Sequence, residues 1–173
     1  MNPLESRRTA LVLIDLMPRI IALETAPLSG SVVLERSVAL AEATRSAGGL
    51  VVNVRVDRPG VEVQPEGSGF APEAAPQPGD LVIVKQTVGA FGRTPLDAEL
   101  QSRGIANVVL AGIATNFGVE STGRAASDLG YETFFLTDAM TGLDDHAHNF
   151  AVSYTFPRLG TLCTTQEYLK ALR

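Results

Sequence analysis

Residues 108–122 read Val-Val-Leu-Ala-Gly-Ile-Ala-Thr-Asn-Phe-Gly-Val-Glu-Ser-Thr, and this stretch decides the fold. An apolar run ends at Gly112, a short polar turn follows, and a helix is expected to begin near Gly118. This order of strand, turn and helix is typical of α/β proteins with a parallel sheet. In such sheets ligands bind beside the carboxyl ends of the strands, so the turn is the first candidate for a functional site.

Short apolar runs alternate with helical patterns along the rest of the chain. The expected strands are residues 10–15, 50–55, 81–85, 107–112 and 132–137, with a weaker sixth at 161–164. The first four are nearly continuous runs of Val, Leu and Ile, as expected where helices cover both faces of a sheet. We therefore expect a three-layer α/β/α, Rossmann-like fold. Its six-stranded parallel sheet has the order 3-2-1-4-5-6, in a single domain of residues 1–173.

The expected helices begin near residues 31, 94, 118, 145 and 164, and glycines or Pro157 mark the ends of most of them. Residues 59–80 break this alternation, because they are rich in proline and glycine and show little periodicity. Two interpretations stay open for this segment. It is either a surface excursion or a lid over the carboxyl edge of the sheet, since long loops in compact domains are often functional.

Composition excludes several classes of protein. The net charge of −5 argues against a nucleic-acid partner, which normally requires a basic face. One cysteine, Cys163, allows neither an intrachain disulfide nor a cysteine-based metal cluster, and we interpret it as a small buried hydrophobic residue. No apolar stretch approaches the length of a membrane span, and the start of the chain lacks the features of a signal peptide. We expect a cytoplasmic protein without a membrane partner.

Two charged residues stand at the ends of apolar strands. Asp15 follows the first strand and Lys85 ends the third. Ends of strands that are separated by one intervening strand lie about 10 Å apart, a gap that an extended lysine largely covers. If Asp15 and the 112–118 turn lie on neighbouring strands, all three segments converge on one pocket. The plainer alternatives are a helix N-cap or ion pair for Asp15, and a solvent-directed side chain for Lys85.

Several segments resemble the isochorismatase-like (cysteine hydrolase) family, and the resemblance covers nearly the whole chain. They include Leu-Ala-Gly-Ile-Ala-Thr-Asn at 110–116, Val-Lys-Gln-Thr-Val-Gly-Ala-Phe at 84–91 and Thr-Asp-Ala-Met at 137–140. The resemblance implies that Asp15 is the acid/base residue and that Lys85 is the cation of the family's Asp–Lys–Cys triad. It also implies that Gly118 occupies the position of the nucleophilic cysteine.

The same resemblance implies a cis peptide bond between Ile113 and Ala114, and an oxyanion site formed by the amides of Ala114 and Gly118. Glycine cannot form the thioester through which the family hydrolyses amides. Isochorismatases also carry glycine there and cleave a vinyl ether with the aspartate as general acid. We therefore expect a hydrolase without a covalent nucleophile, acting on a small carboxylate-bearing substrate. The alternative is a catalytically silent member that binds a small metabolite or a protein partner.

Further candidates for substrate binding are less specific. Asn116 and Phe117 lie in the turn, although Asn116 is also a possible helix N-cap. Phe91 resembles the family's pocket-wall aromatic or is an ordinary core residue. Arg55 is a possible anchor for a carboxylate, with surface pairing as the alternative.

We expect neither a metal nor a cofactor. The stretch after the second strand has no histidine, and the two histidines of the chain, His146 and His148, are spaced so that they face different directions. Relatives in the family commonly form dimers or higher oligomers, so the resemblance implies a homo-oligomer.

Overall fold

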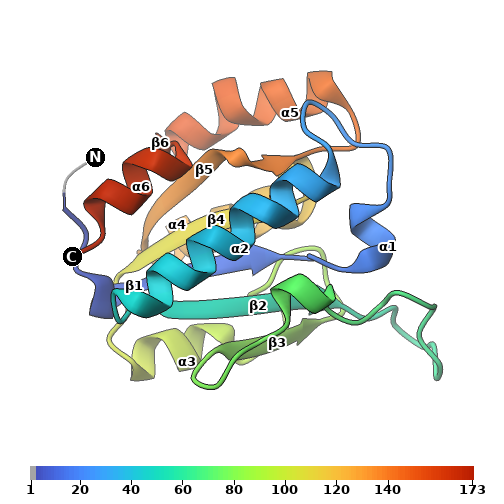
Figure 1. Cartoon of the computed structure of the whole chain (residues 1–173), viewed down its shortest axis with the longest axis horizontal. Helices are drawn as coiled ribbons and strands as arrows, with labels where there is room; N and C mark the ends of the chain where they lie inside the picture. The colour runs from blue at the N-terminus through green and yellow to red at the C-terminus, as the bar shows by residue number, and fades with distance from the viewer. Residues whose placement is uncertain (1–2) are drawn as a thin grey trace.

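A computed structural model describes residues 3–173, and its centre is a six-stranded sheet (Figure 1). The strands are β1 (Thr9–Ile14), β2 (Leu50–Val56), β3 (Leu81–Lys85), β4 (Asn107–Ile113), β5 (Glu132–Thr141) and β6 (Thr161–Cys163). All neighbouring strands pair in parallel, in the order β3-β2-β1-β4-β5-β6. The predicted fold class and strand order are therefore confirmed.

Helices cover both faces of this sheet. The α-helices are α1 (Pro18–Ile21), α2 (Gly30–Ser46), α3 (Leu96–Ser102), α4 (Glu120–Asp128), α5 (Asp145–Phe150) and α6 (Thr165–Ala171). The short 3-10 helices are η1 (Ser6–Arg8), η2 (Pro72–Ala74) and η5 (Phe156–Arg158), and the π-helices are η3 (Thr115–Val119) and η4 (Ala151–Thr155). In Figure 1, α2 and α6 lie in front of the sheet and α4 lies behind it.

The alternation of side chains along β1 explains the two layers. Leu11 and Leu13 point into the cluster that α2 and α6 cover, whereas Val12 and Ile14 point into the cluster that α3 and α4 cover. All six residues of β1 are buried, because it lies between β2 and β4 and has helices on both faces. A strand enclosed in this way reads as the continuous apolar run seen in the sequence.

Three expected boundaries are wrong. The fifth strand continues to Thr141 instead of ending at residue 137, because an irregularity between Leu110 and Gly112 lets β5 resume its pairing with β4 further along. Instead of an α-helix from Gly118, the chain forms the π-helix η3, and α4 begins only at Glu120. The helix expected over 145–156 is divided into α5, η4 and η5.

Residues 59–80 pack beside the first helices. The Gly67 carbonyl accepts a hydrogen bond from the Arg19 amide, and the Ala71 amide donates to the Leu16 carbonyl. At the end of the segment, the Asp80 carboxylate binds the side chain of Arg45 on α2. The segment contains the 3-10 helix η2, and none of its residues lines the large cavity described below. The surface-excursion interpretation fits this packing.

Within the described part of the chain, no helix combines the length and the apolar character that crossing a membrane requires.

Candidate active site

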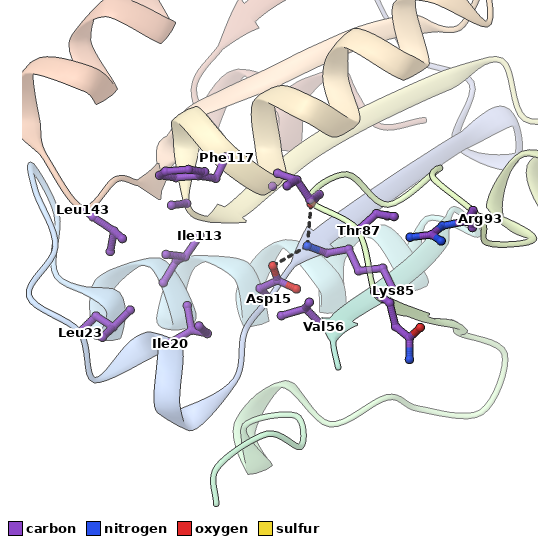
Figure 2. A pocket seen from close by; sticks show the side chains of 14 residues that line it. Asp15, Ile20, Leu23, Val56, Lys85, Thr87, Arg93, Ile113, Phe117 and Leu143 are labelled. Atoms are coloured by element: carbon purple, nitrogen blue, oxygen red, sulfur yellow. Dashed lines mark hydrogen bonds and ion pairs between the residues drawn. The ribbon is translucent and has the colours of Figure 1, made fainter. Parts of the chain in front are cut away.

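The carboxyl edge of the sheet brings Asp15 and Lys85 together. Lys85 Nζ lies 2.8 Å from Asp15 Oδ2 and also donates a 2.8 Å hydrogen bond to the Val88 carbonyl. Lys85 ends β3 and Asp15 follows β1, so the lysine side chain reaches across the end of β2 (Figure 2). The lysine side chain is 2% exposed and the aspartate side chain 9% exposed. The strand-end reasoning predicted this pair.

Two opposing effects act on the Asp15 carboxyl group. Burial favours the neutral acid, whereas the charge and the hydrogen bond of Lys85 favour the carboxylate, with Arg19 contributing more weakly. Burial is the larger effect, and it raises the pKa of Asp15 above the ordinary value. The second oxygen, Oδ1, is buried and has no hydrogen-bond partner among residues 3–173. An unpaired buried oxygen is less costly on a protonated carboxyl group than on a carboxylate.

The backbone at Asp15 is also unusual. Its φ of 53° lies in the left-handed region, which residues other than glycine rarely adopt. The Asp15 amide still bonds the Val54 carbonyl on β2 at 2.9 Å, so the chain leaves the sheet immediately afterwards. Strained non-glycine residues gather at functional sites, where the surrounding structure holds them in place. The strand end thus delivers the carboxyl group into the site instead of continuing the sheet.

Gly118 lies directly against the Asp15–Lys85 pair. A Cβ atom added at Gly118 would lie 3.4 Å from Asp15 Oδ2, 3.5 Å from Lys85 Nζ and 2.7 Å from Ile14 Cγ2. Ile14 is a fully buried residue of β1. The methyl group of Ile14 therefore occupies the space that a side chain at position 118 would need.

The turn between β4 and α4 is hydrogen-bonded to helix α5. The peptide bond between Ile113 and Ala114 is cis, as the resemblance implied. Thr115 Oγ1 lies 2.8 Å from Nδ1 of His148 on α5, and both residues are buried. Burial lowers the pKa of His148, so its neutral form is favoured, and a neutral ring can accept a hydrogen bond from the threonine. His148 therefore supports the turn.

A cavity of about 750 Å³ opens over these groups. Figure 2 shows Asp15 and Lys85 at its centre, with Leu23, Leu143 and Phe117 toward one end. The residues that line it are Asp15, Ile20, Leu23, Val56, Lys85, Gln86, Thr87, Val88, Arg93, Ile113, Ala114, Phe117, Gly118 and Leu143. Neither cysteine nor serine is among them. The hydroxyl of Thr87 already donates to backbone carbonyls of its own loop.

Three of the expected substrate-binding residues are not among those that line this cavity. Arg55 forms an ion pair with Asp57. Phe91 stacks on Tyr131 with the ring centroids 6.0 Å apart, as a residue packed against the core does. The Asn116 side chain is directed toward Gly142, where its Oδ1 would lie 3.5 Å from an added Cβ. Ile113, Ala114 and Phe117 do line the cavity.

Sequence reasoning missed Arg93 and the apolar residues that line the cavity from α1 and from the loop after β5. Arg93 follows a glycine in an exposed loop, and its left-handed backbone, with φ 55°, leaves no signal in the sequence. Ile20 belongs to the four-residue helix α1, and Leu23 lies in the bend after it, so neither follows a clear periodic pattern. Only their position over the strand ends makes them part of the site.

Cys163 and Thr122 have structural roles. Cys163 is 4% exposed in the core below α6, and burial raises the pKa of its thiol to about 12, so it is not a reactive thiolate. The Thr122 hydroxyl donates to the Gly118 carbonyl and accepts from the Ala90 amide, so it ties the turn to the loop after β3.

Among residues 3–173, His, Cys, Asp and Glu side chains do not gather in any group of three that could hold a metal ion.

Known proteins with similar sequences and structures share this architecture. Residues 9–167 match the sequence profile of the isochorismatase domain. An isochorismatase family protein of Bacillus subtilis (strain 168) is 38% identical over 187 residues, which cover 98% of this chain and 97% of that protein. Another, from Escherichia coli O157:H7, is 35% identical over 99% of this chain and 100% of its own length.

A solved structure supports the same assignment. An isochorismatase family protein from Burkholderia thailandensis superimposes with a TM-score of 0.90 and 36% sequence identity, over 99% of both chains. The fold, the matched domain and these full-length relatives agree with one another. The chain belongs to the isochorismatase family.

Proposed function

We propose that this protein is a hydrolase that uses no covalent nucleophile and acts on a small carboxylate-bearing substrate resembling a vinyl ether. Asp15 is its general acid. One observation carries the proposal. A buried Asp15–Lys85 pair lies in a mostly apolar cavity, against a residue, Gly118, that has no side chain to attack a substrate. A cavity that served binding alone would not need a buried acid with a raised pKa.

In the proposed reaction, Asp15 donates a proton to the substrate and takes one back from water. Oδ2 is held by Lys85, and the protonated carboxyl group transfers its proton to the methylene carbon of the vinyl ether. The adjacent carbon becomes an oxocarbenium ion, and the new carboxylate stabilises its positive charge. Water adds to that carbon, and the hemiketal collapses to a ketone and an alcohol. The proton released by the water returns to Asp15, so the enzyme is regenerated.

The turn at 113–118 supplies the remaining polar contacts in this proposal. The amides of Ala114 and Gly118 are the candidate donors to the departing alcohol oxygen, which gains negative charge as the hemiketal collapses, since such a site needs no side chain. Ile113 and Phe117 are apolar walls of the same cavity. We retain a homo-oligomer in the cytoplasm as the proposal for assembly and location.

Pyruvate release from isochorismate tests this proposal. The wild-type protein is compared with Asp15→Asn, which keeps the shape of the side chain but cannot donate the carboxyl proton. We expect turnover to fall about 10²- to 10⁴-fold in Asp15→Asn, the usual contribution of a general acid. Asp128→Asn, at an exposed position of α4, is the matched control and should keep wild-type turnover.

Equal turnover of the wild type and Asp15→Asn would contradict the role of Asp15. Absence of pyruvate release by the wild type, from isochorismate and from chorismate, would remove vinyl ethers from the substrate class. A protein that binds these molecules and turns over neither would match the silent, metabolite-binding alternative.

A further inference from the structure

Arg93 brings an unpaired positive charge to the cavity. It lines the cavity together with Lys85, and Figure 2 shows it on the opposite side of Lys85 from Leu23 and Leu143. The Lys85 ammonium group is already hydrogen-bonded to Asp15 Oδ2 and to the Val88 carbonyl, each at 2.8 Å. Arg93 has no ion pair, and its side chain has no hydrogen bond, with any of residues 3–173. Of the two cations that line the cavity, Arg93 is therefore the one whose polar atoms are not already bound by the described residues.

The loop that carries Arg93 is rigidly built. The Thr87 hydroxyl lies 2.8 Å from the Gly89 carbonyl oxygen and 3.0 Å from the Gly92 carbonyl oxygen, so its one proton is shared between two carbonyls of the loop. A Cβ atom at Gly92, the preceding residue, would lie 2.8 Å from the same hydroxyl, so a side chain there would require Thr87 to shift. The backbone of Arg93 is thereby fixed, and its guanidinium group extends from a defined point on the cavity rim.

The conformation of Arg93 is one that glycine adopts more readily. Its φ of 55° lies in the left-handed region, where a side chain is strained. Within the described chain, Arg93 and Asp15 are the only two residues other than glycine with a positive φ, and both line the cavity. Strained positions of this kind cluster where a ligand is held. Arg93 therefore stands at a position whose backbone conformation favours glycine.

The rest of the cavity determines which ligand suits this charge. Ile20, Leu23, Val56, Phe117 and Leu143 give it an apolar wall. The protein as a whole carries a net charge of −5, so its overall field repels anions and an anion site must be built locally. Guanidinium binds planar carboxylates and phosphates through two parallel hydrogen bonds. A ligand with an apolar body and one anionic group matches both features.

We propose that Arg93 binds the anionic group of the ligand and leaves the neutral part of the molecule against Asp15. This role was expected for Arg55, whose guanidinium is instead paired with Asp57. That this ligand is also the substrate rests on the proposed function. The preference of the cavity for anions is independent of it.

Binding of three small aromatic probes tests the proposal without any turnover. Benzoate and phenyl phosphate are anionic, benzamide is neutral, and all three fit a cavity of about 750 Å³. Dissociation constants are measured by calorimetry for the wild type, Arg93→Gly, Arg93→Lys and Arg7→Met. Arg93→Gly removes the charge and relaxes the backbone, so its Tm should equal or exceed that of the wild type. Arg7 is an exposed residue before β1, at the opposite edge of the sheet, and serves as the control.

We expect Arg93→Gly to bind the anionic probes about 10- to 100-fold more weakly, as the loss of a charge-assisted hydrogen-bond pair implies. Benzamide binding should not change, Arg93→Lys should keep part of the affinity, and Arg7→Met should match the wild type. A larger loss for phenyl phosphate than for benzoate would identify phosphate as the preferred group, and the reverse would identify carboxylate. Equal anion affinity in wild type and Arg93→Gly would overturn the proposal, as would a wild type with no preference for anions.

The two proposals fail separately. If Asp15→Asn keeps full turnover while Arg93→Gly loses anion binding, the acid assignment is wrong and the anion site remains. If turnover depends on Asp15 while anion binding is indifferent to Arg93, the reaction remains and Arg93 is only a surface residue.

Discussion

At the scale of single residues, Gly118 is closely packed against the Asp15–Lys85 pair and against Ile14. Its lack of a side chain leaves room beside Asp15 and Lys85, and the methyl group of Ile14 lies where a Cβ would be. The Ile14 side chain is fully buried in the apolar cluster beside the sheet, so a shift of its methyl group would disturb the packing there. A side chain at position 118 would therefore require Ile14 to shift.

Replacement of Gly118 by alanine tests this packing. The new methyl group would lie 2.7 Å from Ile14 Cγ2, so we expect Gly118→Ala to lower the free energy of unfolding by about 1–3 kcal/mol, the usual cost of overpacking. Gly69→Ala is the matched control, because a Cβ there meets nothing within 4 Å. Urea denaturation of both variants measures the difference. An unfolding free energy for Gly118→Ala equal to that of Gly69→Ala would show that Ile14 leaves room for a side chain.

The residue scale also shows where sequence reasoning succeeds. Asp15 and Lys85 could be predicted as a pair because each ends an apolar run, and parallel strands bring their carboxyl ends to one edge. Arg55 and Arg93 could not be ranked in the same way. Both are arginines near that edge, and only the three-dimensional structure shows that one is paired with Asp57 while the other lines the cavity.

At the scale of elements, α4 contains a glycine where alanine would ordinarily be better. A Cβ at Gly123 would lie 2.6 Å from both Cε1 and Cζ of Phe135. Phe135 is stacked on Phe156 with the ring centroids 4.0 Å apart, and both side chains are fully buried. Gly123 therefore lets α4 approach β5 closely. This close contact explains why glycine stands at position 123, although glycine has a low helix propensity.

We expect Gly123→Ala to reverse the usual effect of this substitution. In an exposed helix, alanine stabilises by about 1 kcal/mol relative to glycine. Here the contact with Phe135 should make the variant less stable by about 1–3 kcal/mol. Ser127→Ala, on the same helix, reports the effect of propensity without that contact. Thermal or urea unfolding compares the two, and a stabilised Gly123→Ala would show that Phe135 yields.

Helix and strand boundaries were the least predictable part of the elements. The chain forms the π-helix η3 before α4 and the π-helix η4 after α5. Both depend on backbone hydrogen bonds that the periodicity of the side chains does not predict. The extension of β5 to Thr141 follows from an irregular pairing with β4. The existence and order of the elements were predictable, because buried parallel strands leave continuous apolar runs.

At the scale of the whole molecule, a hydrogen-bonded cluster joins distant parts of the chain. The Asp80 carboxylate accepts hydrogen bonds from Arg45 on α2 at 2.9 and 2.7 Å, and from Asn53 on β2 at 3.0 Å. The backbone amide of Gln77 adds a fourth at 2.8 Å. This cluster fixes the end of the long segment before β3, so that β3 and Lys85 are correctly placed.

The pH dependence of stability tests this cluster. Burial favours the neutral form of Asp80, but the bonds from Arg45, Gln77 and Asn53 outweigh it and hold the pKa of Asp80 below the ordinary value of 3.8. The unfolded chain therefore binds the proton more readily, and the stabilisation is present above that value and lost as the pH falls through the folded pKa. We expect Asp80→Asn to cost about 1–3 kcal/mol at neutral pH and less in acid. A cost that stays constant down to acidic pH would show that the carboxylate charge contributes nothing.

The measurement that tests the proposed reaction most directly is the titration of the Asp15 carboxyl carbon by ¹³C NMR, assigned with Asp15→Asn. It requires no knowledge of the substrate. Burial raises the pKa of Asp15 in spite of Lys85, so we predict a midpoint clearly above the ordinary value of 3.8. A midpoint at or below 3.8 would mean that Lys85 dominates, and that Asp15 is ionised and unable to act as a general acid at neutral pH.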